Sequence, residues 1–209
     1  MTQLNRRDFI LGATALAGVA GLASPALAVD LAKLYAEPEL GDMALGQGAT
    51  DAKVTIIEYA SATCPHCAKF HEETYGTLKA DYIDTNKIRF VFREFPLNDG
   101  ALAAFMIARS APKESYFPLI DIYFSTLKTW AAGNWVEGLF NIAKQAGFTR
   151  EKFHATLKDE ALARKILAIR DAGAEFGVKG TPTFFINGEI LDGEQNVEAF
   201  KKKIDPLLG

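Results

Sequence analysis

The chain has 209 residues, of which 23 are basic and 26 acidic, so its formal net charge at pH 7 is −3. A negative chain without a basic surplus excludes nucleic acid as a partner, because phosphate binding needs clustered Lys and Arg. The length fits one domain with a full core, and two cysteines are too few for a disulfide framework.

The first 28 residues have the pattern of an export signal. Arg6 and Arg7 precede an uncharged, Ala- and Gly-rich stretch that ends in Ala26-Leu27-Ala28, a small-residue cleavage pattern. The stretch is long enough to span a bilayer, but it is only weakly apolar and Pro25 interrupts it, which favours cleavage over anchoring. We predict removal of residues 1–28 and a periplasmic location. The paired arginines are typical of the twin-arginine route, and a basic start is also found in signals of the general export pathway, so both routes stay open. Cleavage removes two arginines and one aspartate, so the remaining chain carries one more net negative charge.

Residues 29–52 show scattered Gly and Pro with little periodicity, and they are predicted to form an N-terminal arm that packs on the domain or stays partly mobile. Regular structure is expected to begin near Lys53. The β-branched, apolar run Val54–Tyr59 predicts a buried strand. Pro65 then falls at the first turn of a predicted helix, whose buried face is marked at helical spacing by His71, Tyr75, Leu78 and Tyr82.

The rest of the chain predicts an α/β domain over residues 53–209. A second strand at Ile88–Phe95, stopped by Pro96, completes a parallel βαβ unit. Strand patterns are missing from about 98 to 177, where four amphipathic patterns separated by Pro112, Gly133 and Gly147 predict a helical insertion. A hairpin follows, with strands at Thr183–Ile186 and Glu189–Leu191 around Asn187-Gly188, and then a last helix marked by Val197, Phe200, Ile204 and Leu207.

Cys64-Pro65-His66-Cys67 contains both cysteines of the chain. Two cysteines this close together enclose a loop too short to stabilise a fold much, so the pair is interpreted as chemical. A helix N-terminus lowers the pKa of a thiol because its free N–H groups and its dipole favour negative charge. Cys64 is therefore the predicted nucleophile and Cys67 the resolving thiol. His66 can donate to the Cys64 thiolate or add a positive charge beside it.

These features resemble the DsbA family of exported thiol:disulfide oxidoreductases. The resemblance is carried by Cys-Pro-His-Cys after a strand, the helical insertion, and Gly180-Thr181-Pro182-Thr183-Phe184-Phe185-Ile186-Asn187-Gly188. It implies a thioredoxin-like fold, β-α-β then β-β-α, over about residues 54–204. It also implies that Thr181-Pro182 is a cis proline loop that lies against the active-site disulfide and contacts substrates.

The resemblance also implies roles for two further residues, Thr181 and Glu58. Thr181 differs from the valine of the family's namesake and is similar to the residue in the isomerases and some other oxidases, which bears on substrate preference. Glu58 looks like the buried acid that manages the proton of the resolving cysteine, although a single Glu in a strand is more often solvent-facing or paired. The resemblance also implies a pKa near 4 for Cys64, against about 8.5 for a free cysteine.

A zinc site is the main structural alternative for the Cys-x-x-Cys motif. Tetrahedral zinc needs about four ligands, and besides the cysteines the chain offers only His66, His71 and His154. No fourth ligand is evident beside Cys64, Cys67 and His71, so we expect no metal and no cofactor. His71 and His154 are interpreted as surface or packing residues.

Three functions remain open at this stage. The first is a monomeric periplasmic oxidase that passes its disulfide to unfolded or reduced exported proteins and is reoxidised by a quinone-linked membrane partner. The second is a disulfide isomerase or reductase that uses the same cysteines. The third is a redox-dependent, chaperone-like protein whose client binding does not need the cysteines.

Overall fold

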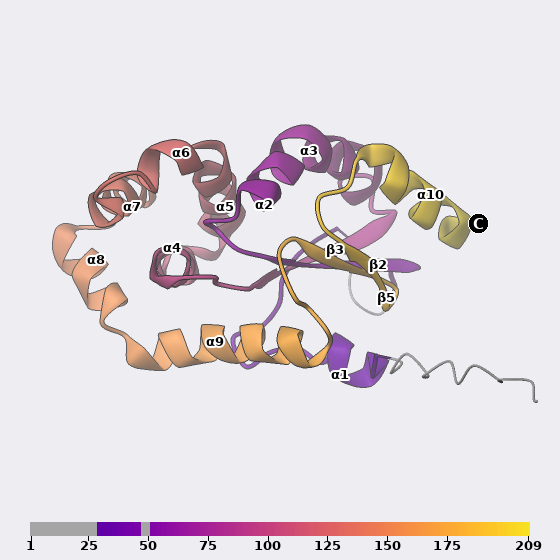
Figure 1. Cartoon of the computed structure of the whole chain (residues 1–209), viewed down its shortest axis with the longest axis horizontal. Helices are drawn as coiled ribbons and strands as arrows, with labels where there is room; N and C mark the ends of the chain where they lie inside the picture. The colour runs from indigo at the N-terminus through magenta and orange to yellow at the C-terminus, as the bar shows by residue number, and fades with distance from the viewer. Residues whose placement is uncertain (1–28, 47–50) are drawn as a thin grey trace, which may run out of the picture.

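The computed structural model describes residues 29–46 and 51–209, and the predicted export signal lies outside these residues (Figure 1). Its centre is a five-stranded sheet with the order β1-β3-β2-β4-β5. The strands are β1 (Met43–Gly46), β2 (Val54–Ala60), β3 (Ile88–Glu94), β4 (Thr183–Ile186) and β5 (Glu189–Asp192). β2 and β3 are parallel, and the other neighbouring pairs are antiparallel.

Helices cover both faces of this sheet (Figure 1). One face is packed by α1 (Leu31–Tyr35) and α9 (Glu160–Glu175), and the opposite face by α2 (Pro65–Phe70), α3 (Gly76–Leu78) and α10 (Val197–Leu208). All seven residues of β2 are buried because helices pack on both of its faces. Alternation along β2 directs Ile57 and Tyr59 toward the α9 side, and it places Ile56 and Glu58 on the face covered by α2.

The expected order β-α-β, helices, β-β-α is confirmed. The helices between β3 and β4 are α4 (Asp99–Ser110), α5 (Tyr116–Ser125), α6 (Leu127–Trp130), α7 (Trp135–Ala143), α8 (Arg150–Leu157) and α9. Of these, α6 and α8 had no counterpart among the four predicted patterns. The helix α8 buries only Phe153 and Thr156, so its sequence carries too few apolar positions to show a helical period.

The helix that follows the cysteines is not uniform. It runs from Pro65 to Ile83 as α2, a π-helical segment (His71–Tyr75), α3 and a second π-helical segment (Lys79–Ile83). Tyr75, Leu78 and Tyr82 are buried, as their spacing predicts. π-Helical turns inside α-helices are rare and are found frequently at functional sites, which draws attention to His71.

The expectation that regular structure begins near Lys53 is wrong. The helix α1 and the strand β1 precede this residue, and β1 pairs antiparallel with the edge of β3, Met43 opposite Phe92 and Gly46 opposite Arg89. Both elements are only four or five residues long, which is too short to show a period in the sequence. Tertiary contacts, including the fully buried Leu34, fix them instead.

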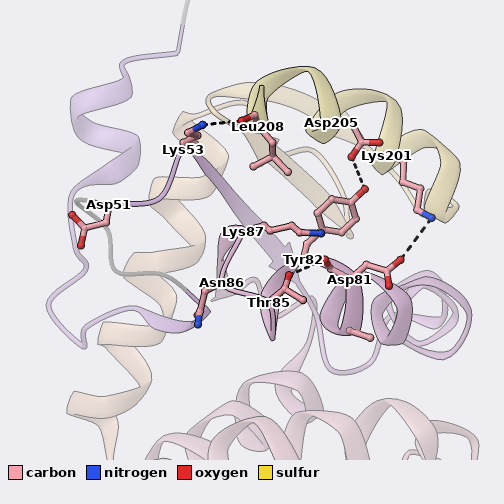
Figure 2. Close-up of a pocket in the computed structure, with 11 residues that line it drawn as sticks. Asp51, Lys53, Asp81, Tyr82, Thr85, Asn86, Lys87, Lys201, Asp205 and Leu208 are labelled. Atoms are coloured by element: carbon pink, nitrogen blue, oxygen red, sulfur yellow. Dashed lines mark hydrogen bonds and ion pairs between the residues drawn. The ribbon is translucent and has the colours of Figure 1, made fainter.

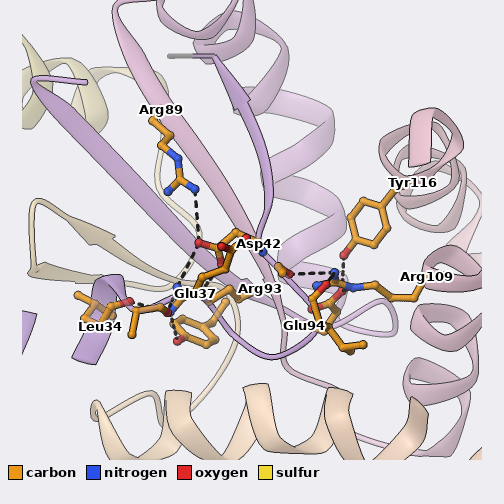
Figure 3. Close-up of polar contacts among 12 residues, drawn as sticks. Leu34, Glu37, Asp42, Arg89, Arg93, Glu94, Arg109 and Tyr116 are labelled. Carbon is orange, nitrogen blue, oxygen red and sulfur yellow. Dashed lines mark hydrogen bonds and ion pairs between the residues drawn. The ribbon is translucent and has the colours of Figure 1, made fainter. Parts of the chain in front are cut away.

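Two buried arginines bind the backbone of residues 34–41 (Figure 3). Arg93 donates to the carbonyl oxygens of Leu34 at 2.8 Å and Ala36 at 3.1 Å, and its Nε donates to Asp42 Oδ1 at 3.1 Å. Arg109 donates to the carbonyl oxygens of Leu40 and Gly41 at 3.1 and 3.0 Å. Residues 34–42 therefore belong to the folded core.

We expect Asp42→Ala to lower the free energy of unfolding by about 3–5 kcal/mol, because it leaves the buried Arg93 guanidinium without its carboxylate. Urea denaturation measures the change. Glu39→Ala is the matched control, since Glu39 pairs with Lys165 through a carboxylate that is 74% exposed, and its loss should change stability by less than about 1 kcal/mol. Equal losses in the two variants would contradict the structural role given to Asp42.

A surface hollow of about 710 Å³ lies between α10 and the segment that precedes β3 (Figure 2). Tyr82 Oη donates to Asp205 at 2.6 Å, and Lys53 Nζ donates to the Leu208 carbonyl oxygen at 2.8 Å. Lys53 precedes β2, whereas the cysteines follow its other end, so this hollow is remote from the Cys-x-x-Cys motif. Its paired groups attach the C-terminal helix to the second π-helical segment and to the residue that precedes β2. Among the residues that the structure describes, no helix is long and apolar enough to cross a membrane.

Candidate active site

Cys64 is the N-cap residue of α2, with extended backbone angles (φ −87°, ψ 119°) and Pro65 in the first turn. The predicted placement of Pro65 is confirmed, and its fixed φ suits this position. Cys64 and Cys67 are both buried free thiols. The end of β2 thus delivers the first cysteine to the end of a helix where backbone N–H groups are free.

Several donors stabilise the Cys64 thiolate and lower its pKa to about 5. The largest effect is a hydrogen bond from the Cys67 side chain, and the Thr181 side chain and the backbone N–H groups of Cys67 and His66 add to it. Burial works in the opposite direction. The resulting pKa is somewhat above the value near 4 that the family resemblance implied, and Cys64 is still ionised at neutral pH.

The environment of Cys67 has the opposite effect. Burial raises the pKa of Cys67 well above its usual value, and the charges of Glu58 and Cys64 raise it further. The pair therefore combines an ionised thiolate with a thiol that stays protonated at neutral pH. Such an asymmetric pair suits one attacking cysteine and one resolving cysteine.

The Thr181–Pro182 peptide bond is cis, as the resemblance implied. The Thr181 carbonyl oxygen lies 3.1 Å from Cys64 Sγ and accepts a hydrogen bond from Cys64 when this residue is protonated. Thr181 Oγ1 is buried and has no hydrogen-bond partner in the described part of the chain, so its hydroxyl is free to donate when Cys64 ionises. Pro182 is itself held by its carbonyl oxygen, which accepts from the Gly193 N–H at 2.9 Å. This loop brings residues 117 positions away from Cys64 into contact with its sulfur.

Glu58 is a fully buried carboxyl group on the α2-facing side of β2. Its Oε2 lies 3.2 Å from Nε2 of His71, whereas Oε1 has no hydrogen-bond partner within residues 29–46 and 51–209. The prediction that Glu58 is buried near the resolving cysteine agrees with this position and with its effect on the pKa of Cys67. Its role in proton transfer stays a prediction.

The ring of His66 contacts a different residue from the one considered in the sequence analysis. Its Nδ1 lies 2.9 Å from Glu194 Oε2, and its side chain is 68% exposed. Lys69 donates to the other oxygen of Glu194 at 2.6 Å. Glu194 therefore links the loop after β5 to α2, and His66 acts on the Cys64 thiolate through its backbone N–H.

Sequence reasoning missed three residues around this site: His71, Asp121 and Glu194. His71 had a usable signal, because it follows Cys67 by four residues and so occupies the same face of the helix. Asp121 and Glu194 had none, since they come from α5 and from the loop after β5. Over residues 29–46 and 51–209, no group of three or more His, Cys, Asp or Glu side chains is arranged to hold a metal ion.

Comparison with known proteins agrees with this geometry. The sequence profile of the thioredoxin family matches residues 40–206. A relative from Rickettsia bellii that carries the name "Putative protein-disulfide oxidoreductase" is 34% identical over 181 residues, which cover 78% of this chain and 68% of the relative. A second relative from Rickettsia conorii is 34% identical, and the match spans 65% of its length.

Two solved structures share the fold over most of both chains. Wolbachia pipientis alpha-DsbA1 has a TM-score of 0.76 and 29% identity, and the match covers 86% of this chain and 96% of that one. A protein-disulfide isomerase from Novosphingobium aromaticivorans has a TM-score of 0.65 and 26% identity, covering 79% and 96%. The chain is an enzyme of the thioredoxin family and belongs to its DsbA-like protein-disulfide oxidoreductases.

Proposed function

We propose that this enzyme is an exported dithiol oxidase that introduces disulfide bonds into reduced proteins through Cys64 and Cys67. The observation that carries the proposal is the stabilised Cys64 thiolate, with a pKa of about 5. A stabilised thiolate favours the reduced form of the pair, so the disulfide form is the better oxidant.

The proposed reaction has two exchange steps. A client thiolate attacks Cys64 Sγ, the Cys64–Cys67 bond breaks, and its electron pair moves to Cys67, which takes up a proton. A second client thiolate then attacks the client sulfur of the mixed disulfide and expels Cys64 as a thiolate. The client loses two electrons and the enzyme gains them. The low pKa makes Cys64 a good leaving group in the second step.

Oxidation and isomerisation can be separated with one client that has two cysteine pairs. The oxidised enzyme should form disulfides in the fully reduced client at a stoichiometry of about one per enzyme, since each turnover consumes the Cys64–Cys67 disulfide. The isomerase alternative requires the reduced enzyme to convert a scrambled client to its native pairing faster than the oxidised enzyme oxidises the reduced one. The chaperone alternative requires client binding to persist in a variant without either cysteine.

The cellular setting is part of the same proposal. The twin arginines and cleavage pattern in residues 1–28 support export to the periplasm, where reduced exported proteins would be clients. A monomer reoxidised by a quinone-linked membrane partner would complete the cycle. Cell fractionation of the full chain, compared with an Arg6→Lys, Arg7→Lys variant, tests the export route.

Glu58 is proposed as the group that exchanges the Cys67 proton. Oxidised glutathione separates the steps: Cys64 attacks it first, and Cys67 then attacks the Cys64–glutathione disulfide after losing its proton. At pH 7 we expect Glu58→Gln to slow the second step by about 10- to 100-fold and leave the first within twofold, because only the second needs a proton acceptor. Stopped-flow fluorescence resolves the two steps.

The pH dependence distinguishes this role from a purely electrostatic one. The Glu58 charge raises the pKa of Cys67, so its removal lowers that pKa and increases the thiolate fraction. In Glu58→Gln, which lacks the proton acceptor, the rate of the second step should be proportional to the thiolate fraction of Cys67. This rate should therefore rise about tenfold per pH unit between pH 6 and 8. If Glu58→Gln accelerates the second step at every pH, Glu58 acts only through its charge and not as a proton acceptor.

A further inference from the structure

A cleft of about 830 Å³ opens beside the active-site helix. It lies between residues of α2 and the following π-helical segment on one side and residues of α5 and α6 on the other. His71 and Asp121 both line it. The cleft matters for the disulfide chemistry because Cys67 and Glu58 are completely buried and have no direct contact with solvent.

His71 connects the buried carboxyl group to this cleft. Its side chain is only 6% exposed, and its Nε2 lies 3.2 Å from Glu58 Oε2. Its Nδ1 lies 4.0 Å from Asp121 Oδ1 and has no hydrogen-bond partner among the residues that the structure describes. The Asp121 side chain is 57% exposed. A small rotation of the Asp121 side chain would bring its carboxylate within hydrogen-bond distance of Nδ1.

The aromatic neighbours of His71 fix its orientation. The ring centroids of Phe124 and Tyr75 lie 4.3 and 4.5 Å from that of His71, and both rings are inclined to it by about 35°. The imidazole is therefore packed against two rings, with one nitrogen near Glu58 and the other near Asp121. A histidine that served only for packing would not need carboxylates near both nitrogens.

We propose that His71 is a positioning and relay residue that carries the Cys67 proton between Glu58 and solvent in the cleft, with Asp121 as the outer group. This inference rests on the proposed function and on the proton-exchange role of Glu58. It gives a path through the protein for the proton that Cys67 takes up when the disulfide opens and releases when the disulfide forms again.

Each half-reaction moves one proton along this path. When a client opens the disulfide, Cys67 leaves as a thiolate, and Glu58 transfers to it the Nε2 proton of His71, so that Glu58 ends as a carboxylate. His71 then takes one proton at Nδ1 from Asp121 or cleft water. When the disulfide forms again, Cys67 gives up its proton and each transfer runs in reverse. Reduction and reoxidation alternate, so the imidazole returns to its starting tautomer once per catalytic cycle.

Both acidic and basic side chains lie around His71 and along the cleft. Glu58 faces it from β2 and Asp121 from α5, and Tyr75 stacks on it from its own helical segment. The other ionisable side chains that line the cleft are Lys69, Glu72, Glu73, Lys79 and Lys128. The carboxylates of Glu72 and Glu73 could exchange a proton with His71 only through Asp121 or water. Glu73→Gln removes one negative charge from the cleft without removing a proposed relay residue, so it is a suitable control.

The test uses the two-step reaction with oxidised glutathione, and it compares His71→Ala with His71→Phe. Both variants remove the relay, so at pH 7 the attack by Cys67 should slow by about tenfold or more while the attack by Cys64 stays within twofold. Imidazole at about 100 mM should restore the second step several-fold in His71→Ala, because the missing ring leaves a space open to the cleft. It should not restore His71→Phe, whose ring fills that space. His154→Ala, which removes an exposed histidine on α8, and Glu73→Gln should match the native enzyme.

Asp121→Asn supplies a variant that leaves the core intact. It should slow only the second step, by about two- to fivefold, since water in the cleft can replace the outer group in part. If Glu58→Gln slows the second step but the His71 and Asp121 variants do not, the relay is wrong and the proton leaves by another route. If imidazole accelerates His71→Phe as much as His71→Ala, the rescue does not act at this site and the relay is again refuted. Failure of the native enzyme to oxidise a reduced client would instead refute the proposed function.

Discussion

We expect Cys64→Ser to react with disulfide-bonded clients at least about 100-fold more slowly than Cys67→Ser, which should accumulate as covalent adducts. With a pKa of about 5, Cys64 is about 99% thiolate at pH 7, whereas Cys67 stays protonated. In Cys67→Ser, Cys64 attacks a client disulfide and retains one client sulfur, because no second thiol expels it. Non-reducing electrophoresis and mass spectrometry detect the adduct. Adducts that form equally on both variants would contradict the assigned roles.

The choice of residue at position 67 supplies a matched comparison. The Cys67 side chain gives the largest lowering of the Cys64 pKa through its hydrogen bond. A serine hydroxyl can still donate to the thiolate, whereas an alanine cannot. The rate of alkylation of Cys64 as a function of pH should therefore give a higher pKa in Cys67→Ala than in Cys67→Ser. Identical pKa values in the two variants would show that the helix N-terminus and Thr181 alone stabilise the thiolate.

The parts of the fold that the sequence predicts well are those with strong local patterns. The strand β2 follows from a continuous β-branched, apolar run and the helix α10 from apolar residues at a period of 3.6, and both patterns reflect burial against neighbouring layers. Cys64 at the start of a helix follows from the adjacent Pro65. By contrast, α1 and the segment that leads into β1 are held by Arg93 and Arg109, whose contacts with residues 34–42 join distant parts of the sequence. The strand β1 itself is held by its pairing with β3.

The residues of the active site also differ in how well the local sequence predicts their positions. The positions of Cys64 and Cys67 follow from local sequence, and the cis Thr181–Pro182 peptide and the buried Glu58 followed from a family resemblance. The contact of His66 with Glu194 joins residues 128 positions apart, and no periodic pattern encodes it. The spacing of His71 places it on the buried face of its helix and predicts a surface or packing residue, because nothing in the local sequence shows that it lies beside Glu58. Only its contacts with Glu58 and its nearness to Asp121 set it apart.

The redox state should change the stability of the enzyme in a pH-dependent manner. Cys64 is an acid whose folded pKa of about 5 lies below the unfolded value of about 8.5. Its stabilisation of the reduced protein is therefore complete above about pH 8.5 and is lost as the pH falls through 5. At pH 7 it amounts to about 2.7 kcal/mol. The oxidised protein has no such thiolate, but its short disulfide loop contributes about 2 kcal/mol at any pH.

These two contributions predict that the more stable redox form of the enzyme changes with pH. At pH 8 the reduced enzyme should be the more stable form by about 2 kcal/mol, and at pH 5 the oxidised enzyme by about 1.5 kcal/mol. Urea denaturation of both forms at the two pH values measures the difference, and Cys64→Ser, which has no Cys64 thiolate, should lack its pH dependence. Relative to a dithiol whose nucleophile has a pKa near 7, the same thiolate raises the reduction potential by about 60 mV, to a value well above that of thioredoxin. An oxidised form that is more stable at both pH values, together with a thioredoxin-like potential in a glutathione titration, would favour a reductase over the proposed oxidase.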